Sequence, residues 1–307
     1  MTKVLPGSSR AAFDFVLKQW RGLINISLVP MAIILIVSWY QLQGLGTIFE
    51  FIAMQAKLGD KMEMAQIAPL MENLMKFYAV GFLALIAMVW LFVRVVRFWK
   101  TDQGSAFAVT QGEIGSTFLT ILYGLGMLLL TTLLYVAGIV AFAIIAGIGG
   151  ANLGGSNLGA LGAMVLGLVA VAMVLGLVLF LYRFLVGLPG VAMGETPGFF
   201  SDIWPLAKGE SWGVPVRLLL WSLVAMIPFG ILALTFSVPL MSEVQAQLMA
   251  QDKPQVTPEM LARIVQTMAP LQIINLLIQM PLIWFFSALL SEAHYRFRAK
   301  LSESKNR

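Results

Sequence analysis

The chain has 307 residues, of which 59% are hydrophobic and only 11% are charged, and its net charge is +5. Water-soluble proteins carry roughly 25% charged residues, so this composition excludes an ordinary soluble protein, and its apolar content also excludes intrinsic disorder. The absence of cysteine excludes disulfides, thiolate metal sites and cysteine nucleophiles.

Long stretches without charged residues predict where the chain crosses a membrane. A crossing helix needs about 20 apolar residues to span about 30 Å of hydrocarbon. The longest such stretch, residues 114–182, is too long for one helix and is interrupted by the glycine-rich segment 147–157. We predict an all-α integral membrane protein, a single polytopic domain over residues 1–307. Its six transmembrane helices lie near 23–40, 76–94, 115–146, 160–186, 218–242 and 264–291.

The positions of the basic residues predict the orientation of these helices. Fifteen of the 20 lysines and arginines fall on the side of the membrane that also holds both termini. By the positive-inside rule, this side is the cytoplasm, and we expect a multi-pass protein of the bacterial inner membrane. The first span is long and is not followed by a cleavage signal, so we expect it to remain as an anchor.

An amphipathic segment, residues 9–21, precedes the first span, and we call it the N-terminal segment. Its apolar face comprises Phe13, Val16, Leu17 and Trp20, and its opposite face comprises Arg10, Asp14, Lys18 and Arg21. This pattern predicts a helix lying in the cytoplasmic interface. Segments 105–114 and 196–212 resemble it and precede the third and fifth spans. The chain therefore reads as three hairpin repeats, residues 8–100, 104–190 and 196–300.

Basic residues gather where the spans end on the cytoplasmic side, and we treat them as candidate contacts to the headgroups of anionic lipids. Each basic residue near a membrane surface contributes about 1 kcal/mol to such binding. The alternative is that they serve only topology and interfacial anchoring. The candidates are Arg10, Lys18, Arg21, Arg94, Arg97, Lys100, Arg296 and Arg298.

The loops on the opposite side, 42–76 and 243–270, are long enough for one or two helices each. Thr257 is followed by Pro258 and Glu259, which is a typical start of a helix. We expect these outer helices to pack on each other or to lie on the outer leaflet, with a groove for a partner as the alternative.

The sixth span carries the strongest polar pattern inside the membrane. Gln272, Asn275 and Gln279 lie on one helical face, and Pro281 follows them. This face is a candidate polar cavity, and interhelical hydrogen bonding is the alternative. No ionisable residue lies at mid-depth in any span, which argues against proton coupling and against carboxylate-based hydrolysis in the bilayer.

Two further features are interpreted as structural. Small residues recur every four positions at Gly155, Gly159, Ala163 and Gly167, which predicts a helix-packing seam, with dimerisation as the alternative. The single histidine, His294, lies just beyond the last span and is expected to be an interfacial side chain, because a metal site needs further ligands. We expect no cofactor, no metal, no catalytic residue and no binding to nucleic acid.

Residues 203–212 resemble an element of one bacterial family. Trp204, Leu206, Lys208, Gly209 and Trp212 match an aromatic–x–Leu–x–Lys–Gly–x–x–Trp pattern ahead of a span. The pattern resembles that of the six-helix membrane domain fused to some glycerophosphodiester phosphodiesterases, and of its stand-alone relatives. The resemblance implies a role near membrane lipids or in envelope upkeep. It carries over no catalytic residues, because these 307 residues include no phosphodiesterase domain.

The sequence therefore supports three functional hypotheses. The first is a non-enzymatic inner-membrane protein that organises membrane lipid, anionic lipid above all, or a partner complex through its interfacial helices. The second is a small passive transporter or lipid-handling permease that uses the polar face of the sixth span. The third is an accessory subunit of a larger membrane complex, or a homo-oligomer.

Overall fold

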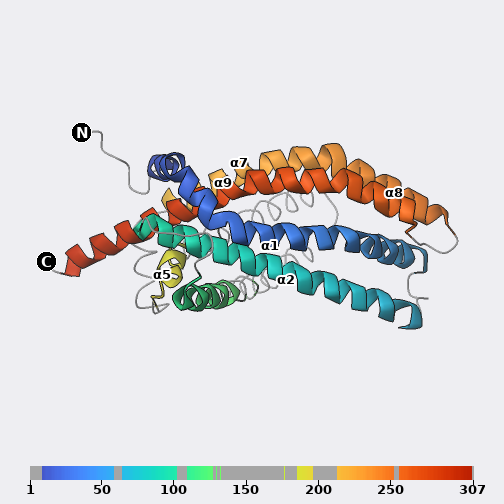
Figure 1. Cartoon of the computed structure of the whole chain (residues 1–307), viewed down its shortest axis with the longest axis horizontal. Helices are drawn as coiled ribbons and strands as arrows, with labels where there is room; N and C mark the ends of the chain where they lie inside the picture. Colours follow the sequence, from blue (N-terminus) through green and yellow to red (C-terminus); the bar gives the residue numbers. More distant parts are fainter. Residues whose placement is uncertain are drawn as a thin grey trace, which may run out of the picture. The chain divides into compact units, whose positions relative to one another are not determined.

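The computed structural model describes residues 9–58, 64–101, 109–126, 185–195, 213–251 and 256–305, together with the single residues 129, 132 and 176. All regular structure in these ranges is helical, as predicted. Figure 1 shows the helices in chain order, from α1 at the N-terminal end to α9 at the C-terminal end.

Helix α1, Ser9–Leu58, is one continuous helix that joins the N-terminal segment, the first span and the beginning of the first outer loop. The predicted helix over residues 9–21 is therefore confirmed, and it continues without a break beyond residue 21. The charges at Arg21 and Glu50 mark where the apolar stretch ends, and they do not end the helix. Figure 1 shows that the first turns of α1 nevertheless run in a different direction from the rest of the helix.

Two more long helices accompany α1. Helix α2 covers Met64–Thr101, and helix α9 covers Pro258–Lys305. The backbone N–H of Met260 donates to the Oγ1 of Thr257 over 3.2 Å, so the predicted start of α9 is confirmed. Segments Ser9–Gln55, Met71–Thr101 and Pro258–Ala299 are each long and apolar enough to cross a membrane, which indicates a membrane protein. The count of six spans and the three repeats stay predictions.

The remaining described helices are shorter. Helix α5 covers Leu188–Ala192, and an unlabelled helix covers residues 111–126. Helix α7, Gly213–Leu232, continues into the π-helix η3, Ala233–Ser237, and then into α8, Val238–Ala250. The predicted fifth span falls in this continuous helical stretch. The candidate packing seam at residues 155–167 and the resemblance at residues 203–212 lie outside the described residues.

The chain divides into two compact units. One consists of Ala12–Glu113 and Ser222–Ala288, and the other of Met1–Ala11, Ile114–Trp221 and Leu289–Arg307. In the first unit, α1, α2 and α9 run alongside one another (Figure 1) and share buried clusters around Leu23, Leu91 and Trp284. Apolar contact between these helices is therefore the main source of packing in this unit.

The C-terminal part of α1, helix α8 and the beginning of α9 share a further buried apolar cluster, which also belongs to the first unit. Across the same region, the carboxylate of Glu50 accepts a hydrogen bond of 2.6 Å from the backbone N–H of Val256, just before α9. The described parts of segments 42–76 and 243–270 that carry this cluster thus pack on each other, as expected. The buried members of the cluster are Phe49, Ala53, Leu240, Val244, Leu248, Met260 and Ile264.

Candidate functional site

The N-terminal segment exposes large apolar and basic side chains together. Leu17 is 71% exposed and Trp20 is 49% exposed, and Lys18 and Arg21 beside them are exposed as well. The Arg21 guanidinium carbon lies 5.3 Å from the centre of the Trp20 ring, within the range of a cation–π contact. A helix surface with this mixture suits the boundary between headgroups and acyl chains, where both kinds of group find partners.

The other side of the N-terminal segment is held against its neighbours by aromatic contacts. The rings of Phe13 and Phe285 of α9 lie 4.6 Å apart, and those of Phe15 and Phe98 of α2 lie 6.1 Å apart. Ala12, directly before Phe13, is fully buried. The segment is thus anchored on α2 and α9, and its exposed face has a fixed position in the unit.

The remaining candidate headgroup contacts differ in how far they are exposed. Lys100 and Arg298 are exposed, and Arg298 also pairs with the carboxylate of Glu195. Arg97 is partly buried and donates from Nη2 to the carbonyl oxygen of Gly112 over 2.7 Å. Arg296 is partly buried and lies 3.6 Å from the carboxylate of Glu292. Of these four residues, Lys100 and Arg298 are the ones whose exposure suits contact with lipid.

Arg94 differs from the expectation that it contacts headgroups, because it is only 3% exposed. Its Nη1 donates to the carbonyl oxygen of Ile26 over 2.8 Å. Pro30, four residues after Ile26, has no N–H to offer that carbonyl, so Arg94 replaces the missing helical donor. The Nε of Arg94 also lies 3.7 Å from the carboxylate of Glu113. Arg94 is therefore an internal side chain that ties α2 to the proline turn of α1.

A second buried chain of hydrogen bonds joins α9 to α1. The indole Nε1 of Trp284 donates to the Oγ of Ser27 over 2.9 Å. The hydroxyl of Ser27 in turn donates to the carbonyl oxygen of Leu23 over 2.6 Å. Sequence reasoning missed this pair, because a serine and a tryptophan 257 positions apart give no local signal.

His294 also differs from its expected place at the interface, because its side chain is 2% exposed. Its Nδ1 lies 2.9 Å from the carbonyl oxygen of Val186, which makes Nδ1 the protonated nitrogen of the neutral ring. Its Nε2 is buried, has no hydrogen-bond partner among the described residues, and lies 3.7 Å from the carboxylate of Glu195. The other carboxylate oxygen of Glu195 pairs with Arg298 of α9.

Two glycines allow Glu195 to reach this position. Gly194 has a φ of +82°, a conformation that side chains disfavour, and it turns the chain back after α5. The backbone N–H of Glu195 then donates to the carbonyl oxygen of Gly190 over 3.0 Å. A Cβ on Gly190 would lie 2.8 Å from the His294 ring and 3.0 Å from the Glu195 carboxylate. The turn therefore fits closely against His294, and only glycine leaves room for it.

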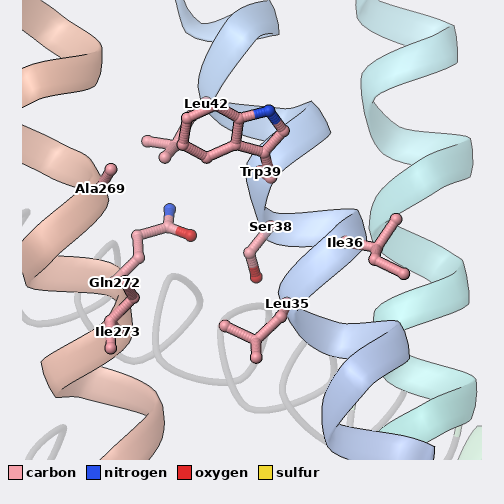
Figure 2. A pocket seen from close by; sticks show the side chains of 8 residues that line it. All are labelled: Leu35, Ile36, Ser38, Trp39, Leu42, Ala269, Gln272 and Ile273. Atoms are coloured by element: carbon pink, nitrogen blue, oxygen red, sulfur yellow. The ribbon is translucent and has the colours of Figure 1, made fainter.

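The three polar residues on one face of α9 have different surroundings. Gln279 donates to the side chain of Asn275 on the same helix over 3.4 Å. Gln272, one turn earlier, lines a pocket of about 320 Å³, and Figure 2 shows its amide extending from α9 toward α1. We call this the α1–α9 pocket, and its wall includes Leu35, Ser38, Trp39 and Leu42 of α1, and Ala269 and Gln272 of α9.

The structure thus offers two surfaces suited to lipid, the N-terminal segment and the α1–α9 pocket, and two buried polar clusters, around Arg94 and around His294. Each cluster joins helices within one unit through contacts that are internal to the protein. Comparison of the chain with protein-family models, curated proteins and solved structures found no match.

Proposed function

We propose that this protein is a non-enzymatic membrane protein that binds anionic lipid at the N-terminal segment and so organises lipid at the membrane surface. The single observation that carries the proposal is the exposure of Leu17 and Trp20 directly beside Lys18 and Arg21. Leu17 and Trp20 would enter the apolar side of the interface, where burying apolar surface is favourable. Lys18 and Arg21 would then lie level with the lipid phosphates.

The proposal places the protein in the bacterial inner membrane with six spans and both termini in the cytoplasm. In that orientation, the N-terminal segment faces the cytoplasmic leaflet, whose anionic lipids attract basic residues. Arg10 on the same helix, and the exposed Lys100 and Arg298, would add to the positive potential on this side. Residues 203–212 resemble a membrane domain whose family implies a role near membrane lipids, and this resemblance agrees with the proposed role.

We expect the double substitution K18Q/R21Q to weaken binding of anionic lipid about 30-fold, because two basic residues at the surface contribute about 2 kcal/mol together. The measurement is the binding of phosphatidylglycerol to the full-length protein in nanodiscs of phosphatidylcholine, followed by native mass spectrometry. K76Q is the matched control, because Lys76 is an exposed residue on α2 that pairs with Glu72. Equal affinity in the wild type, K18Q/R21Q and K76Q would contradict the proposal.

A further inference from the structure

The α1–α9 pocket lies about one membrane thickness from the charged residues at the other end of the same helices. At 1.5 Å per residue, Trp39 lies about 27 Å along α1 from Arg21. On α9, Gln272 lies about 30 Å from Glu292. The apolar part of a bilayer is about 30 Å thick, so the pocket lies at the interface opposite the N-terminal segment.

The aromatic residues around the pocket agree with this depth. Trp39 and its neighbour Tyr40 are 52% and 50% exposed, in a helix whose composition suits a membrane span. Tryptophan and tyrosine are enriched at membrane interfaces, where the ring is apolar and the polar atom reaches water or headgroups. The pocket therefore opens where the acyl chains of a lipid meet its glycerol backbone.

The wall of the pocket is apolar apart from a few uncharged polar groups. Figure 2 shows the Gln272 amide on one wall and the Ser38 hydroxyl and Trp39 indole on the other. The amide of Gln272 has no hydrogen-bond partner among the described residues, so its N–H groups are available to an occupant. None of the described residues that line the pocket is charged, so an ionised headgroup would find no counter-charge among them.

We infer that the α1–α9 pocket binds the ester-linked glycerol region of a membrane lipid, with one acyl chain along its apolar wall. An ester carbonyl is an acceptor without charge, which matches the donors of the Gln272 amide. The volume of about 320 Å³ lies at the lower end of the range of small-molecule sites, which suits part of a lipid. This site is separate from the one in the proposed function, and it does not depend on anionic lipid.

The test uses a phosphatidylcholine that carries a diazirine near the ester end of one acyl chain, at a low fraction in phosphatidylcholine nanodiscs that contain the full-length protein. After photolysis, we expect the labelled peptides to include Trp39–Leu42 of α1 and Ala269–Ile273 of α9. We expect Q272L to lower this labelling about fivefold, which is the effect of one hydrogen bond. The matched control is Q279L, because Gln279 is bonded to Asn275 and does not line the pocket.

A second pair of variants tests the cavity itself. A269W fills the pocket and should abolish the labelling, whereas I274W places the same side chain on an exposed position of the same helix and should leave it unchanged. The ether-linked analogue of the photolipid has no carbonyl to accept a hydrogen bond from Gln272. We therefore expect the wild type to be labelled by the ether lipid as weakly as Q272L is labelled by the ester lipid.

Two outcomes would overturn the inference. One is labelling spread evenly over the exposed surfaces of α1, α2 and α9 and unchanged in both Q272L and A269W. The other is an equal effect of Q272L and Q279L. Phosphatidylglycerol and the K18Q/R21Q substitution should leave the labelling unchanged, so failure here is distinct from failure of the proposed function.

Discussion

Replacing Arg94 by leucine should lower the free energy of unfolding by about 3–5 kcal/mol, the range found when one member of a buried ionic contact is removed. The substitution leaves the carbonyl of Ile26 without the Arg94 donor, in a helix where Pro30 cannot supply one. It also removes the cation beside the partly buried carboxylate of Glu113. The measurement is equilibrium unfolding of the purified protein in mixed micelles.

The proline supplies an internal control for this prediction. P30A restores an N–H to α1 that can donate to the carbonyl of Ile26, so R94L should cost less in the P30A background by about 1 kcal/mol. R97Q removes a nearby arginine that is bonded to the carbonyl of Gly112 at a less buried position, and it should cost much less than R94L. Equal costs for R94L with and without Pro30 would show that Arg94 does not serve that carbonyl.

Introducing a single methyl group at Gly190 should lower the free energy of unfolding by about 1–3 kcal/mol, the usual cost of overpacking a filled site. The new Cβ would lie 2.8 Å from the Cε1 of His294 and 3.0 Å from the carboxylate of Glu195. Because Gly190 of α5 lies against these two side chains, G190A must displace Glu195 from His294 or from Arg298. Thermal unfolding in detergent, followed by circular dichroism, measures the loss.

Removing the imidazole tests the cause of that loss. In the H294A background, the methyl group of G190A keeps only its close contact with the Glu195 carboxylate, which is the end of a flexible side chain, so its further cost should fall well below its cost in the wild type. G115A is the matched control, because Gly115 is an exposed helical glycine with no atom within 4 Å of the added Cβ. It should stabilise the protein by about 0.5–1 kcal/mol, since alanine is the better helix former. A full cost of G190A in the H294A background would contradict the account of the His294 contact.

The class of the protein and the character of its N-terminal segment could be predicted from the sequence. The class follows from the apolar content of the chain. The amphipathic character of the segment follows from the spacing of residues such as Leu17 and Lys18 along one helix. The start of α9 at Thr257 was predictable for the same reason, because a cap is a local feature. The continuity of α1 could not be predicted, since the charges at Arg21 and Glu50 end an apolar stretch of sequence but leave the helix intact.

The buried polar clusters could not be predicted, because each depends on residues that meet only in the folded chain. An arginine at the end of an apolar stretch is expected to extend toward headgroups. Arg94 instead turns inward because Pro30, on another helix, leaves a carbonyl without its donor. His294 meets Glu195 through a turn that Gly190 and Gly194 make possible, and nothing near His294 in sequence indicates that contact.

The most direct test of the account is the depth of the N-terminal segment in a bilayer. The natural chain has no cysteine, so L17C, I36C and S302C each give a single site for a nitroxide label. Position 36 is an exposed apolar site within a candidate span, and position 302 is an exposed site near the end of α9. The measurement compares the accessibility of each label to oxygen and to a water-soluble nickel complex.

We predict that the label at position 17 lies between those at 36 and 302 in depth. We also predict that phosphatidylglycerol moves it deeper in the wild-type background, and that K18Q/R21Q prevents this movement. A label at position 17 that is as accessible to nickel as the label at 302, with and without phosphatidylglycerol, would contradict the central claim that this segment binds anionic lipid.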